Sequence, residues 1–563
     1  MVHPKEGRIT LYDTTLRDGS QAEDVLFTVE DKLRILQRLD EFGVDFIEGG
    51  WPGANPKDEL FFQQAKSVPL RHSRLTAFGS TRKPKSKVEN DPVLNGLLRA
   101  ETSVVTIFGK SWDLHVSRAL GITLEENLHI IDDSIRFLKQ RVDTVFFDAE
   151  HFFDGYKAAP EYALKVLETA RDAGADCLVL CDTNGGSLVH EIAQITQTAQ
   201  ALGAPLGIHC HNDADLAVAN SLSALTSGAM HVQGTINGIG ERCGNANLVS
   251  IIANLCLKMG CNTNITPEQL ARLTPLSRFV DEMINRSPRK NQPYVGQSAF
   301  AHKGGIHVSA VLKDAATYEH VVPELVGNRQ RVLVSEQSGK SNLIYKFREM
   351  GIEFNGTVEE DGKLAGLLQK IKELEKEGYQ FDGAEGSFEL LARRALGKMP
   401  EYFAPRGFRV IDERRFRETS AEGCPGLLRV RDSEGTVKLL VAGVVEHLVS
   451  EGTGPVDALY NALHKVLQRY YPSLASNRMM LMDYKVRILN KGGTDAKVRV
   501  LVGWRDHSRS WSTVGVSDHI IEASYDAMLD AITYKLFKDG IAPLGGVAPT
   551  FGVIPADFVK ECV

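Results

Sequence analysis

The 563-residue sequence lacks the features that mark several large classes of protein. No apolar run approaches the roughly 20 residues that cross a bilayer, and the polar residues 1–7 lack the apolar core of a signal peptide. Acidic and basic side chains nearly balance, 72 Asp and Glu against 65 Lys and Arg. That balance gives no electrostatic reason to expect nucleic acid or an anionic membrane as a partner. We therefore expect a cytoplasmic protein that binds neither.

Cysteine is scarce, with 8 residues in all, and no pair of C-x-x-C motifs is present. A zinc ribbon or finger is therefore not expected. Most of the thiols are expected to be small buried groups in a reducing compartment. The 43% of hydrophobic residues suffices for several cores, and at roughly 150 residues per domain the length predicts three or four folding units.

Short β-rich runs alternate with amphipathic helical stretches from about residue 8 to 260. The capping patterns at 28–31 and 123–126 each predict a helix start, and Gly43 ends the first of these helices. Eight strand–helix units over about 250 residues are the number and size of a (β/α)8 TIM barrel, whereas a doubly wound open sheet usually has fewer strands. The runs begin 25 to 39 residues apart: Arg8–Asp18, Val44–Gly50, Arg74–Thr81, Ser103–Ser111, Val142–Glu150, Asp176–Gly185, Leu206–Asp213 and His231–Gly240.

Polar residues gather at the carboxyl ends of these runs, where the active site of such a barrel lies. Polar groups there are costly unless they meet water, a ligand or a metal. The candidates are Arg17, Asp18, Glu48, Asp148, Glu150, Asp182, Thr183, Asn184, His209, His211, Asn237, Glu241 and Asn245.

Three of these residues predict a metal centre. Side chains alternate along a strand, so His209 and His211 should point to one face. Asp18 follows the strand that closes the barrel beside them, and Asn245 is able to add a neutral oxygen. Such a mixed N/O set suits Mn, Fe, Zn or Mg. A histidine pair on a strand is also compatible with a purely structural role.

Three motifs carry a resemblance to a known family: Asp13–Gln21 (DTTLRDGSQ), His209–Asn212 (HCHN) and Gly238–Asn245 (GIGERCGN). They resemble the signatures of the 2-isopropylmalate, homocitrate and citramalate synthases, which are metal-dependent barrels that condense acetyl-CoA with a 2-oxo acid. Phe46–Lys57 (FIEGGWPGANPK) looks like the citramalate synthase branch, because isopropylmalate synthases have a stretch closer to E-V-G-F-P there.

The resemblance implies a reaction and its ligands. Acetyl-CoA and pyruvate would give (R)-citramalate and CoA, as the first step of a threonine-independent route to isoleucine, with isoleucine as inhibitor. One divalent ion, Mn²⁺ or Mg²⁺, with Zn²⁺ as an alternative, would bind Asp18, His209, His211 and Asn245. A 2-isopropylmalate synthase that uses 2-oxoisovalerate and is inhibited by leucine is the main alternative. A lyase or aldolase, a biotin-dependent carboxyltransferase barrel and an inactive amino-acid sensor are further ones.

Several residues at the barrel mouth have expected roles in this condensation. Arg17 is expected to point away from the neighbouring metal ligand and to stabilise developing alkoxide. Gln21 and Glu48 are expected to hold substrate or ordered water. Glu150 would order substrate or join in proton transfer. Thr183 would bond the substrate carboxylate, although it is equally compatible with a capped turn, and Arg17 with a structural ion pair.

The glycine-rich stretch after the last strand does not have the spacing of a dinucleotide-binding loop. By resemblance Gly238, Gly240, Glu241 and Gly244 belong to the acetyl-CoA side of the site. Glycines permit close backbone approach there, and they also suit a tight turn.

Beyond the barrel, residues 286–345 suggest an active-site flap. By resemblance His307 reaches the active site of a partner subunit and takes part in proton transfer, and Tyr318 lies in the same site. Ser309 occupies the position where the family usually has an acid. A plain loop is the alternative interpretation for His307 and its neighbour His302.

The predicted domains are a catalytic barrel (1–285), linker subdomains with the flap and helices (286–405), an α+β regulatory domain (406–540) and a tail (541–563). The third contains two β-rich/α halves and resembles the family's C-terminal regulatory domain, which binds an end-product amino acid near a dimer interface. We expect a homodimer. The expected effector contacts are Gly493, Thr494, Asp495 and Ala496, and dimerisation alone is the alternative role.

Overall fold

The computed structural model describes residues 7–335, 338–419, 426–489 and 496–545. The chain forms two compact units, Met1–Ala301 with Glu319–Arg331, and His302–Tyr318 with Val332–Val563. Among the described residues, no helix combines the length and the apolar character that crossing a membrane requires.

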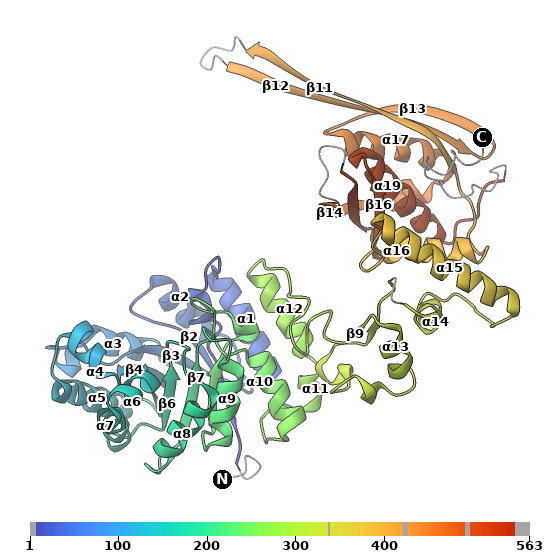
Figure 1. Cartoon of the computed structure of the whole chain (residues 1–563). Helices are drawn as coiled ribbons and strands as arrows, with labels where there is room; N and C mark the ends of the chain where they lie inside the picture. Colours follow the sequence, from blue (N-terminus) through green and yellow to red (C-terminus); the bar gives the residue numbers. More distant parts are fainter. Residues whose placement is uncertain (1–6, 336–337, 420–425, 490–495, 546–563) are drawn as a thin grey trace. The chain divides into compact units, whose positions relative to one another are not determined.

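The first unit is a closed barrel of eight parallel strands in chain order (Figure 1). The first strand pairs with the second and also with the eighth, which closes the sheet. The predicted (β/α)8 barrel is confirmed, and the open doubly wound sheet is excluded. The strands are β1 (Thr10–Asp13), β2 (Phe46–Gly50), β3 (Arg74–Ser80), β4 (Val104–Lys110), β5 (Thr144–Glu150), β6 (Cys177–Asp182), β7 (Leu206–Cys210) and β8 (His231–Gly234).

The strands are shorter than the β-rich runs, chiefly at their carboxyl ends. The first run extends to Asp18, but β1 ends at Asp13, so Arg17 and Asp18 lie in the turn that follows. Strand β7 ends at Cys210, and His211 lies just beyond it in an isolated bridge to Asn245. The polar ends of the runs leave the hydrogen-bonded ladder and form the loops at the barrel mouth.

Local sequence signals explain where the helices begin and end. Helix α1 (Val29–Phe42) starts with a capping box between Thr28 and Asp31 and ends at Gly43, whose φ of 97° suits glycine. Helix α5 (Leu124–Lys139) is capped by the Thr123 side chain. The other main helices of this unit are α2 (Pro56–Ala65), α3 (Pro92–Arg99), α6 (Phe152–Ala158), α7 (Pro160–Asp172), α8 (Val189–Gln200), α9 (Ala217–Thr226), α10 (Leu248–Asn254) and α12 (Leu273–Met283).

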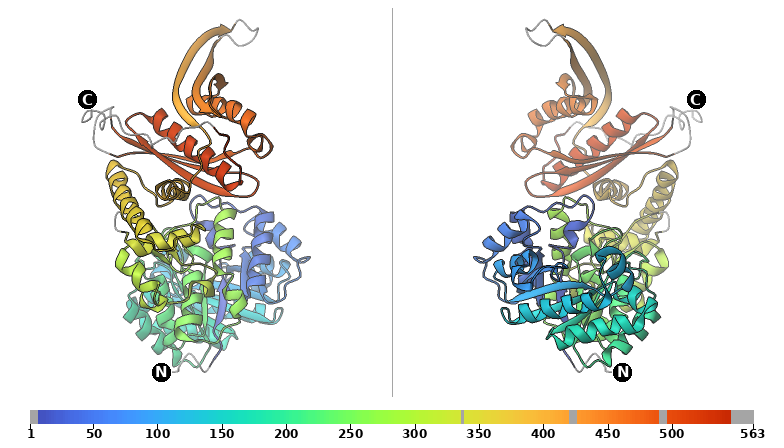
Figure 2. Two further views of the ribbon diagram at one scale, coloured as in Figure 1. Left: turned by 90° about the vertical axis from the view of Figure 1, so that its right-hand side faces the viewer. Right: turned by 90° about the vertical axis from the view of Figure 1, so that its left-hand side faces the viewer.

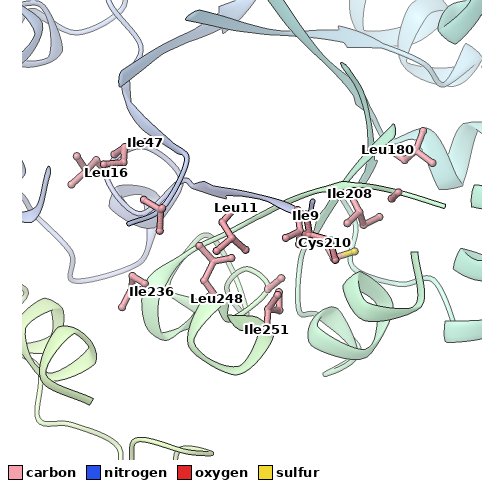
Figure 3. Close-up of a cluster of buried hydrophobic side chains, with 14 of the residues drawn as sticks. Ile9, Leu11, Leu16, Ile47, Leu180, Ile208, Cys210, Ile236, Leu248 and Ile251 are labelled. Atoms are coloured by element: carbon pink, nitrogen blue, oxygen red, sulfur yellow. The ribbon is translucent and has the colours of Figure 1, made fainter. Parts of the chain in front are cut away.

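The barrel has an outer and an inner core. Outward strand side chains pack against the helices, and Figure 3 shows Leu11 of β1 in one cluster with Leu248 and Ile251 of α10. Inward side chains include Tyr12 and Phe146, which pack in one cluster inside the barrel. Because strand side chains alternate, the inward positions nearer the carboxyl ends line the mouth.

The second unit contains helices and a repeated α+β fold. Helices α14 (Lys340–Glu349), α15 (Val358–Glu377) and α16 (Glu385–Ala395) share an apolar cluster, as expected for a helical connector. Two three-stranded antiparallel sheets, each followed by a long helix, confirm the predicted repeat. The first is β11 (Ala404–Thr419), β12 (Gly426–Val441), β13 (Val444–Gly452) and α17 (Pro455–Tyr470). The second is β14 (Met480–Ile488), β15 (Val498–Arg505), β16 (Ser510–Ser517) and α19 (Ile520–Lys538).

The hairpin formed by β11 and β12 projects beyond α17 and α19 in Figure 1 and in both views of Figure 2. The domain limits drawn from the sequence, at residues 285, 405 and 540, stay predictions.

Candidate active site

Three predicted metal ligands converge at the barrel mouth. Asp18, His209 and His211 are buried and offer ligand atoms that all lie within 4.8 Å of one another. Nε2 of His209 lies 3.3 Å from Oδ2 of Asp18, and Nε2 of His211 lies 4.0 Å from the same oxygen. Two imidazoles and a carboxylate at this spacing can hold one divalent cation and leave positions open for other ligands.

Asn245 supplies a test of whether a metal fits. Its bridge to His211 brings it beside the triad, and its side-chain oxygen is buried without a hydrogen-bond partner. An unpaired buried carbonyl oxygen is costly, and a cation would satisfy it. The donors present therefore fit a divalent metal ion, with Asn245 as the neutral oxygen ligand.

Arg17 lies directly beside this set. Its guanidinium Nη1 is 3.3 Å from Oδ2 of Asp18, and its Nε donates to Oε1 of Glu48 at 2.5 Å. The expectation that Arg17 points away from Asp18 is wrong, because the two residues lie in a turn, where strand alternation does not apply. Tyr12 donates from its hydroxyl to the second Glu48 oxygen at 2.6 Å.

Burial and charge set the ionisation of these groups. Burial raises the pKa of Asp18, but Arg17 and His209 more than offset this and hold the pKa well below its usual value. Burial disfavours the charge of Arg17, but Glu48 and Asp18 raise its pKa above the ordinary value. Burial, reinforced by His209, lowers the pKa of His211 to about 4, so its imidazole is neutral near pH 7 and available as a ligand.

Glu150 and Thr183 lie at the ends of neighbouring strands. Glu150 ends β5 and pairs with Lys110, which ends β4. The Thr183 hydroxyl oxygen accepts a hydrogen bond from the backbone N–H of His151 at 2.8 Å, which leaves the hydroxyl proton to donate elsewhere. His151 has a φ of 57°, a rare conformation for a residue with a side chain.

The remaining substrate candidates differ in exposure. Gln21 lies exposed in the short helix η1 (Gly19–Gln21). Glu48 is fully buried, and both of its oxygens are engaged by Arg17 and Tyr12. The substrate-binding roles of Gln21 and Glu48 stay predictions.

The glycine loop after β8 holds Asn245 in place. Gly238 and Gly244 have φ values of 66° and 93°, and a Cβ on Gly244 would overlap the Gly238 carbonyl oxygen. A Cβ on Gly240 would overlap the Asn245 amide. Glu241 is exposed at the rim. The loop therefore has a structural reason for its glycines, and its predicted contact with acetyl-CoA stays a prediction.

His307 and Tyr318 lie in the second unit and contact each other. Their rings stack with centroids 4.3 Å apart, and both side chains are exposed. Helix α13 (Gly305–Val311) carries His307 and also Ser309. Of the predicted effector contacts, Gly493, Thr494 and Asp495 lie outside the described residues, while Ala496 is buried.

Sequence reasoning missed three polar residues that support the site, of which Tyr12 and Gln233 are fully buried and Lys110 is partly buried. Tyr12 bonds Glu48, Lys110 pairs with Glu150, and Gln233 bonds His209. All three lie at inward positions of their strands. Lys110 and Gln233 lie opposite the predicted residues Glu150 and His209 on the neighbouring strands. The alternation along β1, β4 and β8 was the signal that would have found them.

Comparison with known proteins agrees with this architecture. Residues 8–277 match the sequence model of the HMGL-like family. Residues 294–378 match the homocitrate synthase post-HMGL domain, and residues 383–536 match the LeuA allosteric (dimerisation) domain.

Relatives that match almost the whole chain belong to two kinds of synthase. The chain is 56% identical to the (R)-citramalate synthase of Aquifex aeolicus over 94% of this chain and 98% of that protein. It is 50% identical to the (R)-citramalate synthase of Synechocystis, over 94% and 97%. The 2-isopropylmalate synthase of Methanocaldococcus jannaschii is 31% identical, over 94% and 95%.

The barrel, its His–His–Asp set and the domains that follow define an HMGL-like condensing enzyme with side chains that can hold a divalent metal ion and a C-terminal domain of the allosteric, dimerising type. The chain belongs to the (R)-citramalate synthase family. The alternatives of a lyase, an inactive sensor or a carboxyltransferase are disfavoured, because the resemblance to citramalate synthases extends over the barrel and the C-terminal domain alike.

Proposed function

We propose that this enzyme condenses acetyl-CoA with pyruvate and water to give (R)-citramalate and CoA. The observation that carries the proposal is the contact of Arg17 with a buried Asp18–His209–His211 set. The relatives named (R)-citramalate synthase, which are 45–56% identical, support the choice of reaction. A cytoplasmic location stays a prediction.

The residues at the mouth divide the chemical work. A divalent ion, Mn²⁺ or Mg²⁺, held by Asp18, His209, His211 and Asn245, would supply a Lewis acid that polarises the ketone. Arg17 would donate to the oxygen that becomes an alkoxide as the carbon–carbon bond forms.

Thr183 and Glu150 would act on other groups of the substrate than the ketone. The Thr183 hydroxyl, which accepts from His151, keeps its proton for the substrate carboxylate. Glu150, paired with Lys110, would order substrate or join in proton transfer at the mouth.

Aromatic side chains beside Arg17 favour a small 2-oxo acid. The guanidinium carbon lies 3.8 Å from the ring centroid of Phe78. Phe108 stacks on Phe78 at 5.6 Å, and Trp51 contacts both rings edge-on. Trp51 also belongs to the stretch that resembles the citramalate synthase branch. These bulky groups agree better with the methyl of pyruvate than with the isopropyl group of 2-oxoisovalerate.

A CoA-release assay across 2-oxo acids tests the function. We expect the highest kcat/KM with pyruvate, a lower value with 2-oxobutanoate and the lowest with 2-oxoisovalerate. Each methylene that the pocket does not accommodate should raise the transition-state free energy by about 1–3 kcal/mol relative to pyruvate. A preference for 2-oxoisovalerate would instead establish a 2-isopropylmalate synthase.

Shared active sites are expected in a homodimer. If His307 acts in the partner's barrel, mixing inactive His307→Ala and Asp18→Asn chains should restore one intact site per heterodimer. The measurement is CoA release after the two chains are co-expressed with different tags and the heterodimer is purified. Each variant alone is the control. A purified heterodimer with no activity would place each site within one subunit.

Isoleucine is expected to inhibit at millimolar or lower concentration, and leucine more weakly. Binding near Gly493–Ala496 would affect turnover only if it favours a less active arrangement. The second repeat is joined to the connector, because Val514 N–H donates to the Ser387 hydroxyl at 3.0 Å and Arg394 pairs with Asp530 at 3.1 Å.

The measurement is inhibition of the full-length enzyme together with isoleucine calorimetry. Thr494→Ala should lose inhibition while keeping turnover in the absence of effector. If the folded wild-type protein binds no branched-chain amino acid, the domain serves dimerisation alone.

A further inference from the structure

Next to the metal-ligand set, a buried glutamine of β8 links side chains of β7 and β5. Nδ1 of His209 lies 2.9 Å from Oε1 of Gln233, and Nε2 of Gln233 donates to Oδ1 of Asp148 at 3.2 Å. The same amide nitrogen lies 3.5 Å from Nε2 of His231. Gln233 is fully buried, and its three partners are each at most 5% exposed.

These partners determine which way the amide faces. In the opposite orientation the amide oxygen would meet an oxygen of Asp148, and the amide nitrogen would face the histidine. In the observed orientation the amide oxygen can only accept, so Nδ1 of His209 carries the proton. Nε2 of His209, which lies 3.3 Å from Asp18, is then the nitrogen that would give its lone pair to a cation bound between the two side chains.

We infer that Gln233, supported by Asp148, is a positioning residue of the metal centre: it holds His209 in the tautomer and orientation that present Nε2 to a divalent cation. The inference rests on the proposed metal centre and adds a residue to it. His211 has no such support among the described residues, because its Nδ1 is buried without a hydrogen-bond partner. The affinity of the centre should therefore depend strongly on Gln233.

An amide suits this position better than a carboxylate. Glu48 and Asp148 already place two carboxyl groups inside the barrel, and both are almost completely buried. A third acidic side chain beside Asp148 would add like charge in a poorly solvated space. Glutamine orients the imidazole while adding no charge to the interior.

The test measures metal affinity of the full-length protein directly, by Mn²⁺ competition against a fluorescent chelator. Gln233→Met keeps the size of the side chain but removes the acceptor, and it should weaken Mn²⁺ binding by about 10–100-fold, the usual effect of losing a partner of a ligating histidine. Thr274→Val is the matched control, because it removes another buried hydrogen bond of the first unit, from Thr274 to the Val326 carbonyl at 2.7 Å. Its affinity should equal that of the wild type.

A second control distinguishes the two buried hydrogen bonds that support the site, from His209 to Gln233 and from Tyr12 to Glu48. Tyr12→Phe loosens Glu48 and hence Arg17, so it should lower turnover while leaving Mn²⁺ affinity unchanged. Folded Gln233→Met with Mn²⁺ affinity within twofold of the wild type would overturn the inference. A wild-type protein that binds no divalent cation would instead overturn the proposed metal centre itself.

A measurement on the wild type covers the case in which Gln233→Met does not fold. Histidine ¹⁵N NMR of the Zn²⁺-loaded protein should show a His209 ring protonated at Nδ1. Protonation at Nε2 contradicts the inference without any substitution.

Discussion

Replacing His211 by alanine should reduce kcat/KM by about 1,000-fold or more. A Lewis acid contributes several kcal/mol of transition-state stabilisation, and each 1.36 kcal/mol corresponds to a factor of ten. His211 is buried and neutral near pH 7, and it is one of three side chains that converge on a single point. Its removal should therefore lower both the metal content and the rate of CoA release.

Two controls make this result specific. His190→Ala changes an exposed histidine of α8 and should leave activity and metal content unchanged. Exhaustive chelation of the wild type should reproduce the loss, and Mn²⁺ or Mg²⁺ should restore activity to the wild type but not to His211→Ala. Full activity of the variant, or of the chelated enzyme, contradicts the proposed metal centre.

The barrel was predictable because its signals are local. Helix α1 begins at a capping box and ends at a glycine, and each strand is a short apolar run before polar residues. The alternation that brings His209 and Glu48 to the inside of the barrel holds wherever the chain is truly a strand.

The site was predictable only in part, since its contacts join segments distant in sequence. The expected direction of Arg17 was wrong because the strand ends at Asp13, and the backbone then turns. Gln233 lies 24 residues from its partner His209 and 85 residues from Asp148. Strand alternation indicates that Gln233 faces inward, but the partners it meets there follow from barrel closure and register, which no local pattern specifies.

Arg17→Lys should lower kcat by about 100-fold or more, the scale on which removal of one oxyanion donor acts. Arginine meets three partners at once: Nε donates to Glu48, Nη1 approaches Asp18, and the guanidinium lies over Phe78. Lysine keeps the positive charge but offers one compact ammonium group, which cannot bond Glu48 and still direct a donor toward the substrate. Affinity for the 2-oxo acid should change less than kcat.

Arg74→Lys is the matched control, because Arg74 begins β3 at the opposite end of the barrel and bonds Thr144, Ser103 and Asp143. That change should alter kcat by less than twofold. The separation of kcat from KM decides the role of Arg17, since an interaction made only in the transition state lowers kcat, whereas a uniform binding contact raises KM. Unchanged kcat would make Arg17 a structural partner of Glu48 and Asp18. A large fall in kcat with metal content intact would show that Arg17 acts on the reacting oxygen rather than through the metal ligand beside it.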